Sequence, residues 1–231
     1  MTLSALKPRA ELEQDSLALD PYCKLYLPLW KLDGDSFADR SAYGHLCTNH
    51  GSLWTPQGWS FDGVDDYVDL PDLNLHSLNS LTIETWVKGN SGAGQPAIIA
   101  FGDGTGAGQW SLTLTTYQNK FRFGLESGTI DYNLWGIQTL NIGTGYYLVA
   151  VKDETVIRTY INSVQDDSSS APSTTNDVTN HRIGGMYSTD PNLFWDGLIA
   201  EVLIYSRALT PQEILDHYII RKEMFGKEMF G

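Results

Sequence analysis

The best candidates for a catalytic acid and base in this chain are two pairs of adjacent carboxylates, Asp65-Asp66 and Asp166-Asp167. A glycoside hydrolase needs two carboxyl groups at a set spacing that face the same sugar ring. Neighbouring residues on a strand point to opposite faces, so neither pair can act together from a strand. We therefore interpret both pairs as turn carboxylates or ion ligands rather than catalytic groups.

The other residue types with catalytic chemistry also lack the spacing that a reaction needs. The glycine-rich segment Gly102–Gly108 lacks the Gly-Lys-Ser/Thr ending of a phosphate-binding loop, which favours a surface loop. No serine lies in a nucleophile elbow. No metal-binding spacing occurs among the five histidines, His45, His50, His76, His181 and His217. The sequence thus predicts no catalytic residues and a protein that is not an enzyme.

Aromatic side chains are the remaining candidates for binding chemistry, because exposed tryptophan and tyrosine rings can stack on sugars. Those near expected loops or strand ends are Trp110, Tyr132, Trp135, Tyr187 and Trp195. Most aromatic residues in a domain of this size fill the core, so packing is the simpler role for each one. The sequence does not single out a cluster, and the carbohydrate-binding residues stay unassigned.

The elements that must position these residues are mostly short strands. Glycine is frequent, with 22 residues, and large aromatic residues are spread along the chain, as in β-sandwiches and barrels. The segment Leu81–Lys88 gives the clearest alternation, with Leu81, Ile83 and Val87 on one face. Further strands are expected at residues 24–29, 45–48, 58–61, 67–70, 97–101, 110–115, 120–125, 129–138, 146–151, 155–162, 182–186 and 198–205. The polar segment Asp166–Thr179 is expected to be a loop.

One helix is predicted near the C-terminus. Thr210, Pro211 and Glu213 form the sequence of a capping box, with proline at the first helical position. We expect this helix to stop at Gly226. The main domain is predicted for residues 22–221, with an N-terminal arm at residues 1–21 and a tail at residues 222–231, where KEMFG occurs twice.

The charge and composition of the chain limit its partners. The formal net charge is −13, which disfavours binding to nucleic acid and to anionic lipid. No apolar stretch is long enough to span a bilayer, and the N-terminus lacks the apolar region of a secretory signal. Cys23 and Cys47 are expected to be buried free thiols, and a disulfide between them is the open alternative.

Several motifs, taken in order, resemble a known family. Residues 59–68 (WSFDGVDDYV) and residues 81–87 (LTIETWV) match two signature segments of laminin-G-like domains. Residues 147–162 are similar to the hairpin of that family, and residues 197–214 to its closing strand and helix. The chain is thereby identified as a laminin-G-like member of the concanavalin A-like lectin/glucanase superfamily over about residues 24–220. The resemblance implies an all-β jelly-roll sandwich of two antiparallel sheets, with one short C-terminal helix.

Two departures from the family pattern concern a metal and a turn. The resemblance implies a structural calcium ligand where this chain has Ala200, with partner ligands at Asp33 and Asp39. Because alanine offers no side-chain oxygen, solvated loop carboxylates are the favoured interpretation, and Ca²⁺ at Asp33 and Asp39 is the alternative. The hairpin turn at residues 162–163 reads Asn-Ser where the family has Asn-Gly, which predicts a looser turn.

Two functions fit these observations. The first is a non-catalytic structural or display module of a larger surface assembly, such as a viral decoration or fibre protein or an extracellular filament subunit. Such a module would form a homo-oligomer through its terminal arms and could also hold glycans, and the extra segment at each end favours it. The alternative is a stand-alone carbohydrate-binding lectin or adhesion module. The expected location is a virion or an extracellular surface, with the cytoplasm as the alternative.

Overall fold

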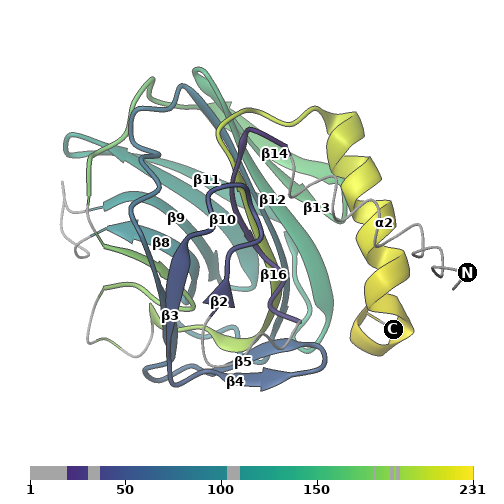
Figure 1. Cartoon of the computed structure of the whole chain (residues 1–231). Coiled ribbons are helices and arrows are strands. Elements are labelled where there is room, and N and C mark those ends of the chain that lie inside the picture. The colour runs from purple at the N-terminus through teal and green to yellow at the C-terminus, as the bar shows by residue number, and fades with distance from the viewer. Residues whose placement is uncertain are drawn as a thin grey trace, which may run out of the picture.

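The fold is given by a computed structural model that describes residues 20–30, 37–102, 110–178, 180–187, 190 and 193–230. Within these residues, two antiparallel sheets of eight strands each pack face to face, and the helix α2 lies outside them (Figure 1). The predicted all-β sandwich with a C-terminal helix is confirmed. The predicted N-terminal arm lies outside the described residues except for Asp20 and Pro21, as does most of the segment Gly102–Gly108.

The strands of each sheet, sheet 1 and sheet 2, lie side by side in an order that differs from their order in the sequence. Sheet 1 contains, in spatial order, β14 (Val164–Ser170), β13 (Val156–Ile161), β12 (Gly145–Asp153), β7 (Ser80–Gly89), β16 (Asp196–Tyr205), β5 (Gly58–Asp62) and β4 (Leu53–Thr55), and β1 (Cys23–Leu27) also pairs with β16. Sheet 2 contains β11 (Ile130–Thr139), β10 (Lys120–Ser127), β9 (Trp110–Tyr117), β8 (Ala97–Gly102), β15 (His181–Ile183), β6 (Tyr67–Leu70), β3 (Leu46–His50) and β2 (Phe37–Ala38). Since β16 pairs with β7, β5 and β1, the centre of sheet 1 forms only when both ends of the domain meet.

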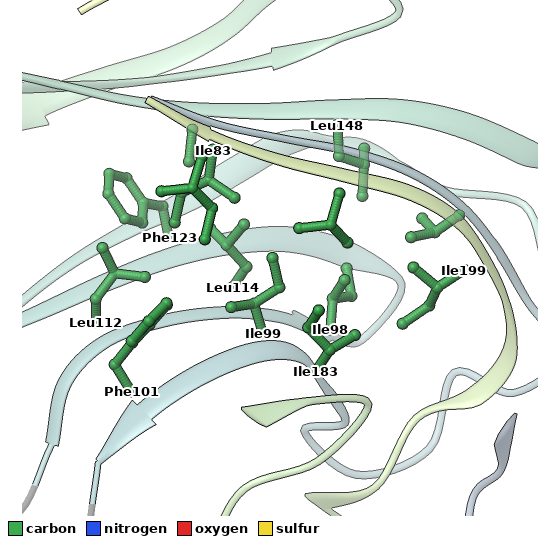
Figure 2. Packing of buried hydrophobic residues seen from close by; sticks show 14 of the residues in the cluster. Ile83, Ile98, Ile99, Phe101, Leu112, Leu114, Phe123, Leu148, Ile183 and Ile199 are labelled. Carbon is green, nitrogen blue, oxygen red and sulfur yellow. The ribbon is translucent and has the colours of Figure 1, made fainter. Parts of the chain in front are cut away.

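The core lies between the inner faces of the two sheets. On β7, Leu81, Ile83 and Val87 point into it, as their alternation predicts. Figure 2 shows Ile83, Leu148 and Ile199 of sheet 1 opposite isoleucine, leucine and phenylalanine side chains of β8, β9, β10 and β15 in sheet 2. Burying one such side chain contributes about 1.5–3 kcal/mol. This layer therefore supplies most of the stability and decides which side chains face outward.

An edge strand replaces part of a predicted loop. The loop prediction for Asp166–Thr179 is wrong for its first residues, because β14 reaches Ser170 and pairs with β13. Asn162 and Ser163 have φ angles of 52° and 69°, the left-handed conformation that a two-residue hairpin turn needs at both positions. Pairing with β13 across this turn holds a polar segment that has little strand propensity of its own. The strands β2 and β4, with two and three residues, are too short to give an alternation pattern.

Two aspartates occupy positions where a neighbouring strand would otherwise pair. Asp166 of β14 accepts hydrogen bonds from the backbone N–H groups of Ile137 and Gln138 on β11, both at 2.9 Å. These bonds join the last strand of sheet 1 to the last strand of sheet 2. At β1, the Asp39 carboxylate accepts a hydrogen bond from the backbone N–H of Tyr26 at 2.9 Å.

Asp39 is the centre of a buried hydrogen-bond network. Its two oxygens accept five hydrogen bonds of 2.7–3.0 Å, from the backbone N–H groups of Tyr26, Ser41 and His45 and from the side chains of Ser41 and His45. The Asp39 side chain itself is fully buried. This network fixes the segment between β2 and β3 against β1.

The helix α2 (Pro211–Phe230) begins at the predicted capping box. The backbone N–H and the hydroxyl of Thr210 donate to the Glu213 carboxylate, and the Glu213 N–H donates to the Thr210 hydroxyl at 3.2 Å. The predicted stop at Gly226 is wrong, because the helix continues to Phe230. One glycine costs about 1 kcal/mol in a helix, and the lysine, glutamate and methionine residues around it are strong helix formers. Among the described residues no helix is both long and apolar enough to cross a bilayer.

α2 packs on the outer face of sheet 1 (Figure 1). A second buried cluster forms there and includes Trp86, Tyr147 and Ile214. The face of β7 that points away from the core is therefore also buried, which its polar residues did not suggest. Glu84 of β7 and Glu201 of β16 lie in this layer, 1% and 0% exposed.

Cys23 and Cys47 are free and buried, and no disulfide joins them, as the favoured interpretation predicts. Cys47 belongs to the core between the sheets, whereas Cys23 belongs to the cluster under α2. Burial raises the pKa of the Cys47 thiol to about 12, and burial with nearby carboxylates raises the pKa of Cys23 as well. Both thiols are therefore poor nucleophiles in the folded chain.

Thr210→Ala tests the helix cap. The substitution removes both hydrogen bonds of the Thr210 hydroxyl and should lower the free energy of unfolding by about 1 kcal/mol. Thr210→Ser keeps the hydroxyl and should unfold close to the wild type. Urea unfolding followed by circular dichroism measures both, and equal midpoints for Thr210→Ala and the wild type would contradict the assignment.

Asp39→Ala tests the network at β1. It removes the acceptor of three backbone N–H groups and should lower the free energy of unfolding by about 3 kcal/mol. Asp72→Ala is the matched control, because Asp72 accepts one exposed backbone hydrogen bond, from Asn74. The same urea titration decides: a loss of under about 1 kcal/mol for Asp39→Ala would show that the network adds little.

Candidate functional site

The outer face of sheet 2 gathers polar and aromatic side chains. Residues that face one another on successive strands form a row across it, in the order Asn133, Gly124, Thr113, Ala100, Arg182 and Asp69. The middle of this row is made of small residues, and larger side chains lie at both ends. These two groups are the tryptophan patch (Tyr117, Arg122, Asn133 and Trp135) and the arginine stack (His50, Tyr67, Asp69, Arg182 and Tyr187).

The tryptophan patch presents a partly open ring that charged and polar groups support. Trp135 is 41% exposed. The Arg122 guanidinium lies 5.0 Å from the centre of this ring, and the Tyr117 ring packs edge-on at 5.4 Å. Arg122 is buried, and its Nε and Nη2 both donate to the Asn133 side-chain oxygen, Nε at 3.0 Å. Burial lowers the pKa of Arg122, against the charge of Asp131. The ring therefore sits on a fixed, cationic support.

Gly124 leaves the space in which this support lies. A Cβ at this position would come within 2.8 Å of the Thr113 hydroxyl and 3.0 Å of both Arg122 Nη2 and the Asn133 oxygen. Real Cβ atoms are seldom this close to their neighbours, so any side chain would displace the guanidinium or the amide. A glycine in the middle of β10 is thus explained by the patch and not by a turn.

The arginine stack holds a cation between two tyrosine rings. The Arg182 guanidinium lies 3.7 Å from the Tyr67 ring centre and 4.5 Å from that of Tyr187. Asp69 accepts from Arg182 Nε at 3.0 Å and contacts His50 Nε2 at 3.0 Å. His50 in turn stacks on Tyr67, with ring centres 4.4 Å apart. Because Asp69 offsets the charge of Arg182, this group is nearer to neutral than its arginine suggests.

The structure separates the five aromatic residues that the sequence could not rank. Trp195 is buried in the core between the sheets, and Tyr132 is partly buried and packs against this core. Trp135 and Tyr187 are 41% and 47% exposed, one in each group, and the side chain of Trp110 lies outside the described part. Arg122 was not among the predicted site residues, although an arginine between Phe121 and Phe123 in an apolar strand is a readable signal.

The described residues do not fit the calcium site that the resemblance implies. Ala200 is buried, lies at a bulge of β16 and offers no side-chain oxygen. The Asp39 oxygens are engaged by five protein donors. Asp33 lies outside the described residues, so a site built around it stays a prediction.

The pair Asp65-Asp66 lies at a turn, as predicted. The turn prediction is wrong for Asp166-Asp167, which lies on the edge strand β14 because that segment pairs with β13. Asp62, Asp65 and Asp66, at the turn between β5 and β6, bring one carboxylate oxygen each within 4.8 Å of one another. Asp66 accepts a hydrogen bond from the Asp62 N–H at 2.9 Å, and burial raises its pKa. Exposed acidic groups are common without an ion, so this cluster by itself assigns no metal.

Two pockets in the described part of the sandwich are too small for a sugar. One of about 30 Å³ is lined by Asn119, Leu140, Tyr146 and Trp195 among others. Another, near His76 and His181, measures about 10 Å³. Such volumes hold about one or two water molecules. Neither pocket is therefore a sugar site, whereas the tryptophan patch and the arginine stack present exposed rings.

Solved structures with the same fold include enzymes and binding domains. The Trypanosoma rangeli sialidase in complex with sialic acid aligns with a TM-score of 0.69 and 16% identity, over 94% of this chain and 38% of the sialidase. The binding domains of botulinum neurotoxin serotypes G and D align with TM-scores of 0.68 and 13% and 14% identity, over 87% of this chain and 51% and 52% of their own. The chain thus spans about two fifths to half of these structures, and identities this low show the fold alone.

Sequence comparison gives the family. No curated protein sequence matches the chain significantly. The Laminin_G_3 family model matches residues 62–215, which is more than half of the chain, and it includes the motifs at residues 81–87 and 197–214 and residues 62–68 of the first motif. The chain therefore belongs to the Laminin_G_3 family of the concanavalin A-like lectin/glucanases superfamily.

Proposed function

We propose that the chain is a non-catalytic glycan-binding module and that sugars stack on Trp135. The observation that carries this proposal is a ring that is 41% exposed and rests on Arg122 and Tyr117. A pyranose presents an apolar face of C–H groups to such a ring, while its hydroxyls need donors and acceptors at the rim. Asn133 is part-exposed beside the ring, and its side-chain NH2 group can donate to these hydroxyls, while Arg122 holds its oxygen in place.

The energetics of this patch predict weak, selective binding. An aromatic contact is worth about 0.5–1.5 kcal/mol beyond its buried area. Because Arg122 and Asn133 already hold each other, little side-chain entropy is lost when a sugar arrives. One ring and a few hydrogen bonds correspond to a Kd of about 1 mM, or about −4 kcal/mol. Repetition of the module would then supply the avidity that a single copy lacks.

Two carboxylates on the same face support the non-catalytic part of the proposal. Asp69 is held by Arg182 and His50, and Glu126 is buried and accepts a hydrogen bond from Asn176 at 3.2 Å. A general acid or base must instead reach the substrate. The family and the botulinum neurotoxin binding domains among its structural neighbours favour a binding module as well.

Trp135→Ala tests the glycan site. A glycan array followed by calorimetry on the best neutral oligosaccharide should give millimolar binding, and Trp135→Ala should weaken it at least about tenfold. Tyr22→Ala is the matched control, because Tyr22 is 53% exposed beside Arg207, at the end of β1 in sheet 1. Equal affinities of the wild type and Trp135→Ala would place the ligand elsewhere, and an array without any binder would contradict the function.

A display role in a surface assembly, on a virion or outside the cell, is a second candidate function. The observation that favours it is an apolar edge, where Ile137 of β11 and Val164 of β14 are 66% and 70% exposed. A second copy could cover these side chains, and association would add affinity for repeated glycans.

Light scattering separates this role from a stand-alone lectin. The full chain should be oligomeric, and Ile137→Glu with Val164→Glu should make it monomeric because two charges would be buried at the contact. Leu53→Glu is the control, since Leu53 is 71% exposed on the distant strand β4. A monomeric full chain would favour the stand-alone lectin.

A further inference from the structure

Two buried ion pairs attach α2 to sheet 1. Glu84 accepts from His217 Nδ1, which lies 3.0 Å from each of its oxygens, and Tyr147 Oη donates to it at 2.5 Å. Glu201 accepts from Arg221 Nε at 2.8 Å. His217 and Arg221 are four residues apart, so both cations lie on the inward face of the helix. The two pairs set the position of α2 along the sheet.

Only one of these pairs can lose its charge near neutral pH. Arginine stays protonated throughout, whereas histidine titrates near pH 6.5 in an unfolded chain. Burial alone would lower the pKa of His217, but the charge and the hydrogen bonds of Glu84 outweigh it and raise this pKa. The titratable and charged groups that face His217 from the surrounding elements are Glu84 on β7, Tyr147 on β12, Glu201 and Tyr205 on β16, Cys23 and Tyr26 on β1, and Arg221 on α2.

The raised pKa of His217 determines at which pH its ion pair with Glu84 is lost. The stabilisation by protonated His217 is complete below about pH 6.5, the unfolded value. It is lost as the pH rises through the higher folded value, because Glu84 then keeps its charge without a cation beside it. Alkaline conditions therefore weaken the attachment of α2 and leave the apolar core between the sheets unaffected.

The layer beneath α2 is less well satisfied than the core. Arg221 Nη1 and Nη2 and the Tyr205 hydroxyl are buried there without a hydrogen-bond partner. Each would gain bonds to water if the helix lifted, which lowers the free energy of local opening. In contrast, opening the sandwich exposes a continuous apolar layer. The helix should thus detach before the sheets separate.

We propose that α2 is a pH-sensitive latch, which opens above neutral pH and uncovers the outer face of sheet 1 while the sandwich stays folded. The uncovered face carries the rings of Trp86 and Tyr147, 4.9 Å apart, next to Glu84 and Glu201. Opening converts a closed surface into an acidic and aromatic one.

The two cysteines are built-in reporters for this motion. Cys23 belongs to the cluster that includes Ile214 of α2, and Cys47 belongs to the core. Maleimide labelling of the full chain at about pH 6.5 and about pH 9, with mass spectrometry of each cysteine peptide, follows both sites at once. Rates are divided by those of the same chain unfolded in urea at each pH, which removes the intrinsic reactivity of the thiolate. The ratio for Cys23 should rise about tenfold, and the ratio for Cys47 should not change.

Substitutions tie the effect to one histidine. His217→Gln should label quickly at Cys23 at both pH values, with Cys47 still protected. His76→Gln is the control, because His76 pairs with Asp177 far from the helix, and it should keep the wild-type profile. The proposal is overturned by a constant Cys23 ratio in the wild type, by a parallel rise at Cys47, or by a pH profile that survives His217→Gln.

Discussion

The apolar contact between the two sheets determines which strand side chains point outward in the described part of this protein. Because side chains alternate along a strand, burying Ile83 and Leu148 on the inner face of sheet 1 sends Glu84 and Tyr147 to its outer face. In the same way, burying Phe121 and Phe123 on β10 sends Arg122 outward from sheet 2. Both outer faces are thus consequences of one core.

The outer faces of the two sheets differ in what covers them. Sheet 1 carries large rings and two carboxylates outward, and it needs α2 to cover the rings and neutralise the acids. Sheet 2 carries small residues in its middle and aromatic and cationic groups at the sides, and no helix of the described chain lies on it. Sheet 1 is therefore committed to internal packing, whereas sheet 2 keeps exposed aromatic rings at both sides, at Trp135 and Tyr187. This division places the proposed glycan site opposite the helix.

Local patterns in the sequence predicted the elements that depend on interactions between residues close together in the chain. The strand at Tyr67–Leu70 and the capping box at Thr210 follow from neighbouring residues alone, and the structure has both. The strand β14 was not predicted, because pairing with β13 outweighs the turn-like character of its own residues. The helix beyond Gly226 was not predicted either, because the helix formers on both sides of this glycine outweigh its cost.

The candidate site was only partly predictable, because exposure depends on which strands become neighbours. Trp135 and Trp195 look alike in the sequence, yet one lies on an outer face and the other is in the core. The partnership of Arg122 with Asn133 requires the register between β10 and β11. Likewise, Glu84 reads as a solvent-facing residue until a helix more than a hundred residues later covers it.

Asp166 gives this sandwich a particular way of meeting other molecules. Strand edges with free N–H groups act as templates onto which further strands add, as in fibrils and shared sheets. On β11 two of these groups already bond to a carboxylate, and the adjoining β14 is rich in aspartate and serine. This edge is consequently a poor template for a further strand. A second copy that met it would contact side chains, and the two copies could separate without breaking a backbone ladder.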